Sequence, residues 1–167
     1  AEVAALQRRT GVAAVIVAPA FPAAGRVTLG GQCFVKGELL TDTEFASDPK
    51  TPVVSASVGA LFSGDVRHVQ PAQLAQALAE ATAEKPVVLV VDAQTDAHLD
   101  EIVTHAIQAE RRPLLVGSAG LCDALSRRLA PVGHGQVLAI VGSMSEIAQK
   151  QLAAVAGHPR CQQIFID

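Results

Sequence analysis

One arginine is the residue best placed to bind an anion. Arg26 ends the loop Ala18-Pro-Ala-Phe-Pro-Ala-Ala-Gly-Arg26, which follows the apolar run Ala13-Ala-Val-Ile-Val17. In open α/β sheets, a buried strand that leads into a loop rich in proline and glycine presents polar groups to a ligand. The alternative is that Arg26 pairs with an acidic residue further along the chain: Asp42, Glu44 or Asp48.

Two Gly-Ser pairs follow other apolar runs and suit an anion as well. They are Gly117-Ser118 and Gly142-Ser143. Glycine lets a ligand approach the backbone, and a serine at a helix start places free N–H groups and the helix dipole toward negative charge. The alternative is plain helix capping, because Ser143 and Glu146 have the spacing of a capping box. Gly120 favours anion binding over plain capping, because a glycine in the first turn of a helix costs up to about 1 kcal/mol relative to alanine and so needs a reason.

A carboxylate follows the most apolar run of the chain. Asp92 comes directly after Pro86-Val-Val-Leu-Val-Val91. Its oxygens could accept hydrogen bonds from a ligand hydroxyl or hold a metal ion. The alternative is that Asp92, with Thr95 or Asp96, only starts the next helix.

The elements that must position these residues alternate between strand and helix. Apolar runs typical of buried strands begin at Ala13, Pro86, Leu114 and Val137, and helical periodicity separates them, as in Leu99, Ile102, Val103, Ala106 and Ile107. This pattern predicts an α/β fold: a doubly wound, mainly parallel sheet with right-handed crossovers and helices on both faces. The carboxyl ends of parallel strands share one edge, so the loops with Arg26, Asp92, Gly117 and Gly142 should line one crevice.

The segment from about residue 19 to 52 departs from this alternation. Gly30-Gly31 lies between two β-like runs, Val27-Thr-Leu29 and Gln32-Cys-Phe-Val35, as in a two-residue hairpin turn. Long excursions are usually functional or disordered, and the apolar residues here favour an ordered flap. We also expect a helix-like run from Val53 to Leu61.

Composition excludes several function classes. The 167 residues carry a net charge of −3, and half of them are apolar. The chain therefore has no basic field for nucleic acid.

The three cysteines form no CxxC pair, and no apolar stretch is long enough for a signal or a membrane span, so we expect a reduced, cytoplasmic protein with no membrane partner. His98 and His105 lie too far apart to share a metal ion, so no metal site is predicted.

Five motifs, in order across nearly the whole chain, resemble the four-carbon acid sugar kinases, the family of D-threonate and D-erythronate kinases. They are Ala18-Pro-Ala-Phe-Pro-Ala-Ala-Gly-Arg26, Asp42-Thr-Glu-Phe-Ala-Ser-Asp-Pro49, Asp92-Ala-Gln-Thr95, Gly117-Ser-Ala-Gly-Leu121, and Gly142-Ser-Met-Ser145 with Gln151. The chain departs from the family pattern at Ser47, where Arg is commoner, and at Ala148, where Thr is expected.

The resemblance implies a two-domain enzyme that transfers the γ-phosphoryl group of ATP, with Mg²⁺, to a four-carbon aldonate. Residues 1–167 would be part of the N-terminal, sugar-acid-binding domain, with the flap at about residues 19–52. The family's opening Asp-Asp-x-Thr-Gly motif and its C-terminal nucleotide-binding domain are missing. We therefore expect the chain to be a piece of a longer protein and to be inactive alone. A homodimer is compatible with the sequence.

The resemblance also implies roles for particular residues, but it identifies no catalytic residue and no metal ligand. The predicted substrate-binding residues are Gly25, Arg26, Asp92, Gly117, Ser118 and Gly120. The predicted nucleotide-binding residues are Gly142, Ser143 and Ser145. The rival interpretation is a non-catalytic module that binds a small acidic sugar or phosphosugar, because its strand-end loops would look the same. A stable core without activity is a third interpretation.

Overall fold

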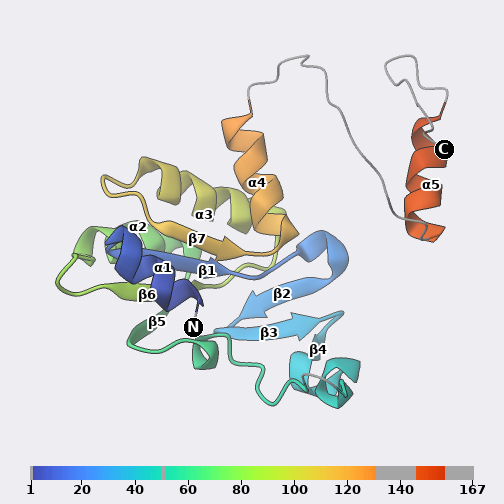
Figure 1. The fold of residues 1–167 in the computed structure, drawn as a ribbon, viewed down its shortest axis with the longest axis horizontal. Coiled ribbons are helices and arrows are strands. Elements are labelled where there is room, and N and C mark those ends of the chain that lie inside the picture. The colour runs from blue at the N-terminus through green and yellow to red at the C-terminus, as the bar shows by residue number, and fades with distance from the viewer. Residues whose placement is uncertain (1, 50–51, 131–145, 157–167) are drawn as a thin grey trace. The chain divides into compact units, whose positions relative to one another are not determined.

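The structure is a computed structural model that describes residues 2–49, 52–130 and 146–156 (Figure 1). The chain divides into two units, Ala1–Pro131 and Val132–Asp167. In the second unit the structure describes one helix, α5 (Glu146–Val155). The predicted strand that begins at Val137 lies outside the described residues. Everything below concerns the first unit.

A four-stranded parallel sheet forms the centre of this unit, as the sequence predicts. The strands lie in the order β5-β6-β1-β7 and are β1 (Ala14–Ala18), β5 (Asp65–Val69), β6 (Val87–Val91) and β7 (Leu114–Gly117). Every residue of β1 and β6 is buried, which explains their unbroken apolar sequences. β1 is central: Ile16 pairs with Leu89 on one side and with Leu115 on the other.

Helices cover both faces of the sheet. On one face, Ile16 and Leu89 pack with α2 (Leu74–Glu80), α3 (Asp96–Gln108) and α4 (Ala119–Leu129). The predicted apolar stripe of α3 is confirmed, since Leu99, Ile102, Val103 and Ala106 are buried. On the other face, Val15 and Val88 pack with Cys33, Val58 and Val3 of α1 (Glu2–Thr10). Within the described residues, no helix is long and apolar enough to cross a bilayer.

The predicted flap is an ordered antiparallel sheet next to the end of β1 (Figure 1). Its strands are β2 (Arg26–Leu29), β3 (Gln32–Val35) and β4 (Glu38–Leu39). Gly30 and Gly31 form the hairpin turn with φ of 61° and 72°. A two-residue turn with both φ angles positive matches the twist of the strands, and glycine adopts it without strain.

Short 3₁₀ turns complete the connections. They are η1 (Pro22–Ala24), η2 (Leu40–Asp42), η3 (Glu44–Ser47), η4 (Gly59–Leu61) and η5 (Pro71–Gln73). The expected helix-like run from Val53 to Leu61 is wrong, because only η4 forms there. The segment pairs with the hairpin instead: Cys33 donates to the carbonyl of Ala56, and Val58 donates to that of Gly31. Tertiary pairing overrides local helix propensity here.

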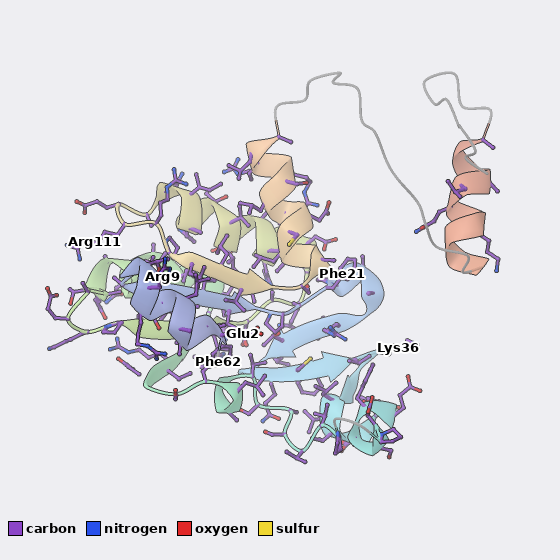
Figure 2. The ribbon with its side chains drawn as sticks, in the orientation of Figure 1. Glu2, Arg9, Phe21, Lys36, Phe62 and Arg111 are labelled. Carbon is purple, nitrogen blue, oxygen red and sulfur yellow. The ribbon has the colours of Figure 1, made fainter. Side chains whose placement is uncertain are left out.

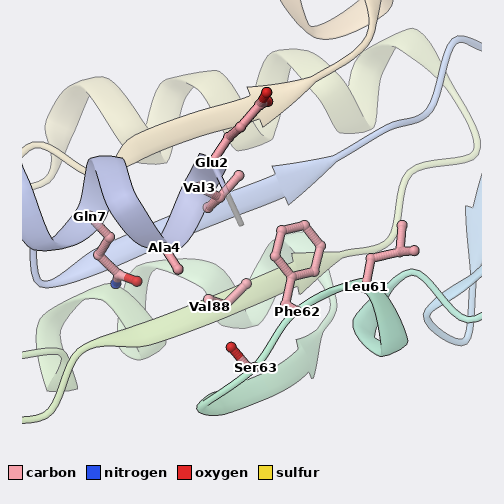
Figure 3. A pocket seen from close by; sticks show the side chains of 8 residues that line it. All are labelled: Glu2, Val3, Ala4, Gln7, Leu61, Phe62, Ser63 and Val88. Carbon is pink, nitrogen blue, oxygen red and sulfur yellow. The ribbon is translucent and has the colours of Figure 1, made fainter.

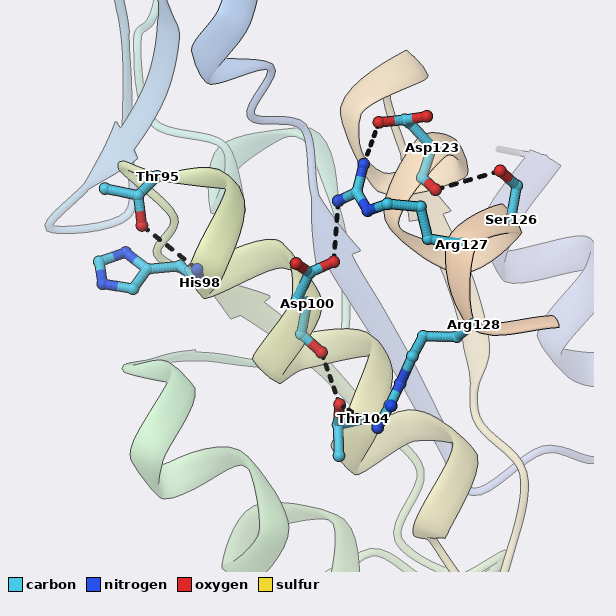
Figure 4. A network of polar contacts seen from close by, with 8 residues as sticks. All are labelled: Thr95, His98, Asp100, Thr104, Asp123, Ser126, Arg127 and Arg128. Atoms are coloured by element: carbon cyan, nitrogen blue, oxygen red, sulfur yellow. Dashed lines mark hydrogen bonds and ion pairs between the residues drawn. The ribbon is translucent and has the colours of Figure 1, made fainter. Parts of the chain in front are cut away.

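A polar network fixes α4 beside α3 (Figure 4). Arg127 of α4 donates to Asp100 of α3 at 2.8 Å and also pairs with Asp123 on its own helix. Arg128 donates to the hydroxyl of Thr104 at 2.9 Å. Exposed pairs of this kind contribute only about 0–1 kcal/mol each. The network therefore helps to set the register of the two helices, and the charge of Arg127 is paired within the fold.

Glycine is required where α4 meets the end of β1. A Cβ atom on Gly117 would lie 2.5 Å from the Cδ2 of Leu121 and 2.7 Å from the carbonyl oxygen of Ala18. A Cβ atom on Gly120 would lie 2.8 Å from the carbonyl oxygen of Ala20. The two carbonyl oxygens belong to the backbone and cannot easily move. The two glycines therefore let β7 and α4 approach the loop that follows β1.

We predict that Gly117→Ala lowers the free energy of unfolding by about 1–3 kcal/mol, the usual cost of overpacking a tight contact. Urea denaturation followed by circular dichroism measures it. Gly59→Ala is the matched control, because its Cβ would meet Val66 at an ordinary 3.4 Å. Equal stability of the Gly117→Ala variant and the parent would contradict the packing role.

Candidate functional site

The carboxyl end of β1 is the switch point of the sheet. From β1 the chain turns to the face that holds the hairpin, whereas from β6 and β7 it turns to the face that holds α3 and α4. Ligands of open α/β sheets bind where connections diverge in this way. Three of the four predicted loops meet at this edge, those that follow β1, β6 and β7. The fourth, with Gly142, Ser143 and Ser145, lies outside the described residues.

Ser118 joins two of these loops. Its hydroxyl donates to the carbonyl of Ala20 at 2.5 Å and accepts from the N–H of Gly120 at 3.2 Å, which caps α4. A serine hydroxyl has one proton to donate and two lone pairs. The proton is committed to Ala20, so the remaining lone pair can only accept. Ser118 in this state suits a sugar hydroxyl better than an anion, which the Gly117-Ser118 pair predicted.

The three predicted glycines of the site shape the backbone. Gly117 and Gly120 allow the close packing described above. Gly25 has a φ of 75° and ends η1, and its N–H donates to the carbonyl of Pro22 at 2.8 Å. This left-handed residue turns the chain into β2 directly before Arg26. Whether these glycines also contact a ligand stays a prediction.

Arg26 is fixed by its backbone. Its N–H and C=O both pair with Phe21, at 3.1 and 2.8 Å, and Phe21 lies at the bend after β1 (Figure 2). Alternation along β2 places Arg26 on the same face as Thr28, which is opposite Cys33. Of the three predicted alternative partners, Asp42, Glu44 and Asp48, the first two form no ion pair with Arg26 among the described residues. The guanidinium is thus presented beside the switch point without either of these carboxylates.

The charge of Arg26 reaches the buried face of the hairpin. Burial raises the pKa of the Cys33 thiol, and the nearby guanidinium of Arg26 offsets only part of this rise. Cys33 therefore stays a neutral thiol at pH 7 and is no nucleophile. Cys33 is 6% exposed and packs as a small buried side chain.

Asp92 has protein donors at both of its oxygens. Its Oδ2 accepts from the N–H of Gly30 at 2.8 Å and from Gln70 at 2.7 Å. Its Oδ1 accepts from the N–H of Gly31 at 3.0 Å and lies 3.0 Å from the Nε2 of His68. A carboxylate has about four acceptor positions, and these contacts occupy them. The side chain is 2% exposed, so these contacts make Asp92 a support of the site, and its contact with a ligand stays a prediction.

These contacts hold Asp92 ionised. Burial by itself would raise its pKa, but the hydrogen bonds from Gly31, Gly30, Gln70 and His68 together outweigh that effect. The pKa of Asp92 therefore lies below its ordinary value of about 3.9. Hydrogen-bond donors from the hairpin turn and from the end of β5 therefore stabilise the buried negative charge of Asp92.

Two of these partners were missed in the sequence. His68 lies in β5, and Gln70 is the residue between β5 and Pro71. The run Val66-Arg-His-Val69 is short and polar because β5 is an edge strand, so it lacks the apolar signal of the other strands. The usable signal was Pro71, which opens a helical segment and makes Gln70 a residue at a strand end.

The described residues do not fit a resident Mg²⁺ ion. They contain no group of three or more His, Cys, Asp or Glu side chains that could hold a metal. Asp92, the one carboxylate predicted for the site, directs its oxygens to N–H donors. No metal ligand is therefore assigned in this part of the chain.

A cavity of about 340 Å³ lies elsewhere, on the face of the sheet that α1 covers (Figure 3). Figure 3 shows the side chains of Gln7, Phe62 and Val88 around it. None of the predicted site residues that the structure describes lines this cavity. It is separate from the edge where the strand-end loops meet.

The fold and these loops define an α/β domain of the kind that binds ligands at the carboxyl edge of a parallel sheet. Residues 1–125 match the family model described as the sugar-binding N-terminal domain. The chain belongs to this family.

Sequence relatives support the resemblance noted above. The chain is 36% identical to a D-threonate kinase of Salmonella typhimurium over 178 aligned residues, which cover 100% of the chain and 42% of that kinase. It is 34% identical to a D-erythronate kinase of Heliobacterium modesticaldum, over 85% of the chain and 36% of that protein. The chain thus spans about two fifths of the length of these curated relatives.

Solved structures share the fold. A Haemophilus influenzae protein superposes with a TM-score of 0.70 at 23% identity, over 92% of the chain and 41% of that protein. A Bordetella bronchiseptica domain, crystallised with bound citrate as a domain-swapped dimer, has a TM-score of 0.58 at 32% identity. That match covers 87% of the chain and 37% of the Bordetella protein.

We predict that Asp92 makes the stability of the chain pH-dependent in acid. Because its folded pKa is depressed, its contribution is fully present above the unfolded pKa of about 4 and is lost as the pH falls through the lower folded pKa. Asp92→Asn should remove this dependence. It should also lower the free energy of unfolding at pH 7 by about 1–3 kcal/mol, because a buried donor then loses its acceptor.

Urea unfolding from pH 7 to pH 2.5 measures both effects. Asp96→Asn is the matched control, since Asp96 is exposed in the first turn of α3. An Asp92→Asn variant whose stability falls in acid as steeply as that of the parent would refute the assignment.

Proposed function

We propose that this chain forms the sugar-acid-binding portion of an ATP-dependent kinase that phosphorylates a four-carbon aldonate, threonate or erythronate. The observation that carries the proposal is Arg26. Its backbone is fixed beside the switch point of the sheet, and its guanidinium has no ion pair with Asp42 or Glu44. D-threonate and D-erythronate kinases at 33–36% identity support the substrate class.

The chemistry of an aldonate matches these groups. An arginine binds a carboxylate through two parallel hydrogen bonds, which fix both the position and the orientation of a small acid. The remaining lone pair of the Ser118 hydroxyl then suits one of the sugar hydroxyls. Citrate bound to the Bordetella relative supports a site for small carboxylates. Gly25, Gly117 and Gly120 complete the proposed substrate set, because glycine lets a ligand approach the backbone closely.

In the reaction, a hydroxyl oxygen of the aldonate attacks the γ-phosphorus of ATP, the bond to ADP breaks in line, and the hydroxyl proton leaves to a base or to solvent. The described residues contribute binding and orientation of the acceptor. Gly142, Ser143 and Ser145 are proposed to contact the ATP phosphates, and Mg²⁺ enters with ATP. A cytoplasmic location fits the need for ATP.

A non-catalytic binding module is the second candidate, because the family description names sugar binding only. Calorimetric titration of the intact protein with D-threonate, D-erythronate, L-threonate and, separately, ATP-Mg distinguishes the two. Aldonate binding together with aldonate-dependent release of ADP supports the kinase. Binding without release of ADP supports the module, and no binding to any aldonate contradicts both.

We predict that Arg26→Ala weakens aldonate binding about 10- to 150-fold, because charge-assisted hydrogen bonds contribute about 1.5–3 kcal/mol. Arg26→Lys should recover only part of the loss, since lysine has no planar fork. Titration calorimetry of the intact protein measures both. The matched control is Arg67→Ala, which removes an exposed arginine that pairs with Asp65 in β5. Unchanged aldonate affinity in Arg26→Ala would exclude Arg26 from the site.

A further inference from the structure

The position of the arginine depends on a hairpin that is anchored from outside. β2 has four residues and β4 has two, and small sheets of this size are marginally stable by themselves. The inner face of the hairpin is buried, with Thr28 0% and Cys33 6% exposed. The hairpin must therefore be held against the rest of the domain by specific contacts.

The turn of the hairpin ends on one carboxylate. The N–H groups of Gly30 and Gly31 donate to the two oxygens of Asp92, which is 61 residues from Gly31 along the chain. Gln70 and His68, from the end of β5, contact the same two oxygens. Asp92 is thereby oriented by the main sheet on one side and bound to the hairpin on the other.

We propose that Asp92 is a positioning residue, which clamps the β2–β3 turn and so holds Arg26 where it can bind the carboxylate of the substrate. This inference rests on the proposed function. The clamp and the arginine lie at opposite ends of β2, and the paired backbone of that strand joins them: Thr28 exchanges two hydrogen bonds with Ala93, at 2.9 and 3.1 Å. If the turn lost its hydrogen bonds to Asp92, β2 could shift relative to the loop that follows β6, and Arg26 would move with β2.

The arrangement also explains why Asp92 need not touch the substrate. Its acceptor positions are occupied and its side chain is 2% exposed. A ligand hydroxyl could reach it only by displacing one of these donors: the N–H of Gly30 or Gly31, Gln70 or His68. The carboxylate therefore acts through the hairpin.

A double-mutant cycle on the intact protein tests this action. Arg26→Ala, Asp92→Asn and the double variant are compared with the parent by the KM for the aldonate, the KM for ATP and kcat. We expect Asp92→Asn to raise the aldonate KM about tenfold, with kcat and the ATP KM within twofold. In the Arg26→Ala background the same change should add less than twofold. If Asp92→Asn raised the aldonate KM by the same factor in the parent and in the Arg26→Ala variant, Asp92 would not act through Arg26.

A second measurement needs no substrate. The thiol of Cys33 lies on the buried face of the hairpin, whereas Cys122 on α4 is exposed. We expect Asp92→Asn to speed alkylation of Cys33 at least fivefold, resolved by peptide mass spectrometry, and to leave the rate at Cys122 unchanged. Asp96→Asn is the control and should change neither. An unaltered rate at Cys33 overturns the clamp.

The two measurements separate the inference from the proposed function. If the parent protein neither binds nor turns over an aldonate, the proposed function fails, and labelling of Cys33 still decides whether Asp92 holds the hairpin. If Asp92→Asn does not fold, the double variant His68→Ala/Gln70→Ala replaces it, because it loosens the carboxylate without burying an amide beside the turn. Slower or equal labelling of Cys33 in that variant also overturns the clamp.

Discussion

A buried negative charge that needs donors organises the edge of this sheet. Removing a carboxylate from water costs several kcal/mol unless hydrogen bonds replace the lost solvent. Asp92 obtains them from the hairpin turn and from the end of β5. The hydrogen bonds of Asp92, which follows β6, therefore connect the edge strand β5, the strand β6 beside the central β1, and the flap. The flap needs this anchor because its own three strands are too short to form a stable sheet alone.

A second set of contacts fixes the other side of the same edge. Ser118 binds the carbonyl of Ala20 while it caps α4, and Gly117 and Gly120 let that helix start against the loop after β1. The loop is thus held between α4 on one side and the hairpin on the other, where Phe21 pairs with Arg26. Both sets of contacts end on the segment that carries the arginine.

The sequence predicted the sheet well because its signals are local. The unbroken apolar runs at β1 and β6 identify strands buried on both faces, and the stripe from Leu99 to Ala106 identifies α3. Gly30-Gly31 predicted the turn, since its backbone conformation excludes most other residues. The helix expected from Val53 did not form, because pairing of Ala56 and Val58 with the hairpin is a long-range effect that local propensity does not contain.

The candidate site was harder to predict because the same residue types serve ligands and protein. Asp92 and Ser118 are residue types that often bind ligands, and both follow strands of the sheet. The sequence alone cannot show that Asp92 accepts a hydrogen bond from Gly30 or that Ser118 donates one to Ala20. Gln70 and His68 escaped notice because an edge strand has no continuous apolar run.

Residues that hold the backbone of this site differ from those that face its open edge. Groups that hold the backbone, such as Asp92, cannot change without moving several elements at once. Under the proposed function, Arg26 and the neighbouring loop surface have fewer such ties, so different small acids could bind there on the same support. Relatives at 25–36% identity include D-threonate, D-erythronate and 3-oxo-tetronate kinases. Under the proposed function, one set of supporting contacts of this kind would serve relatives that act on D-threonate, D-erythronate or 3-oxo-tetronate.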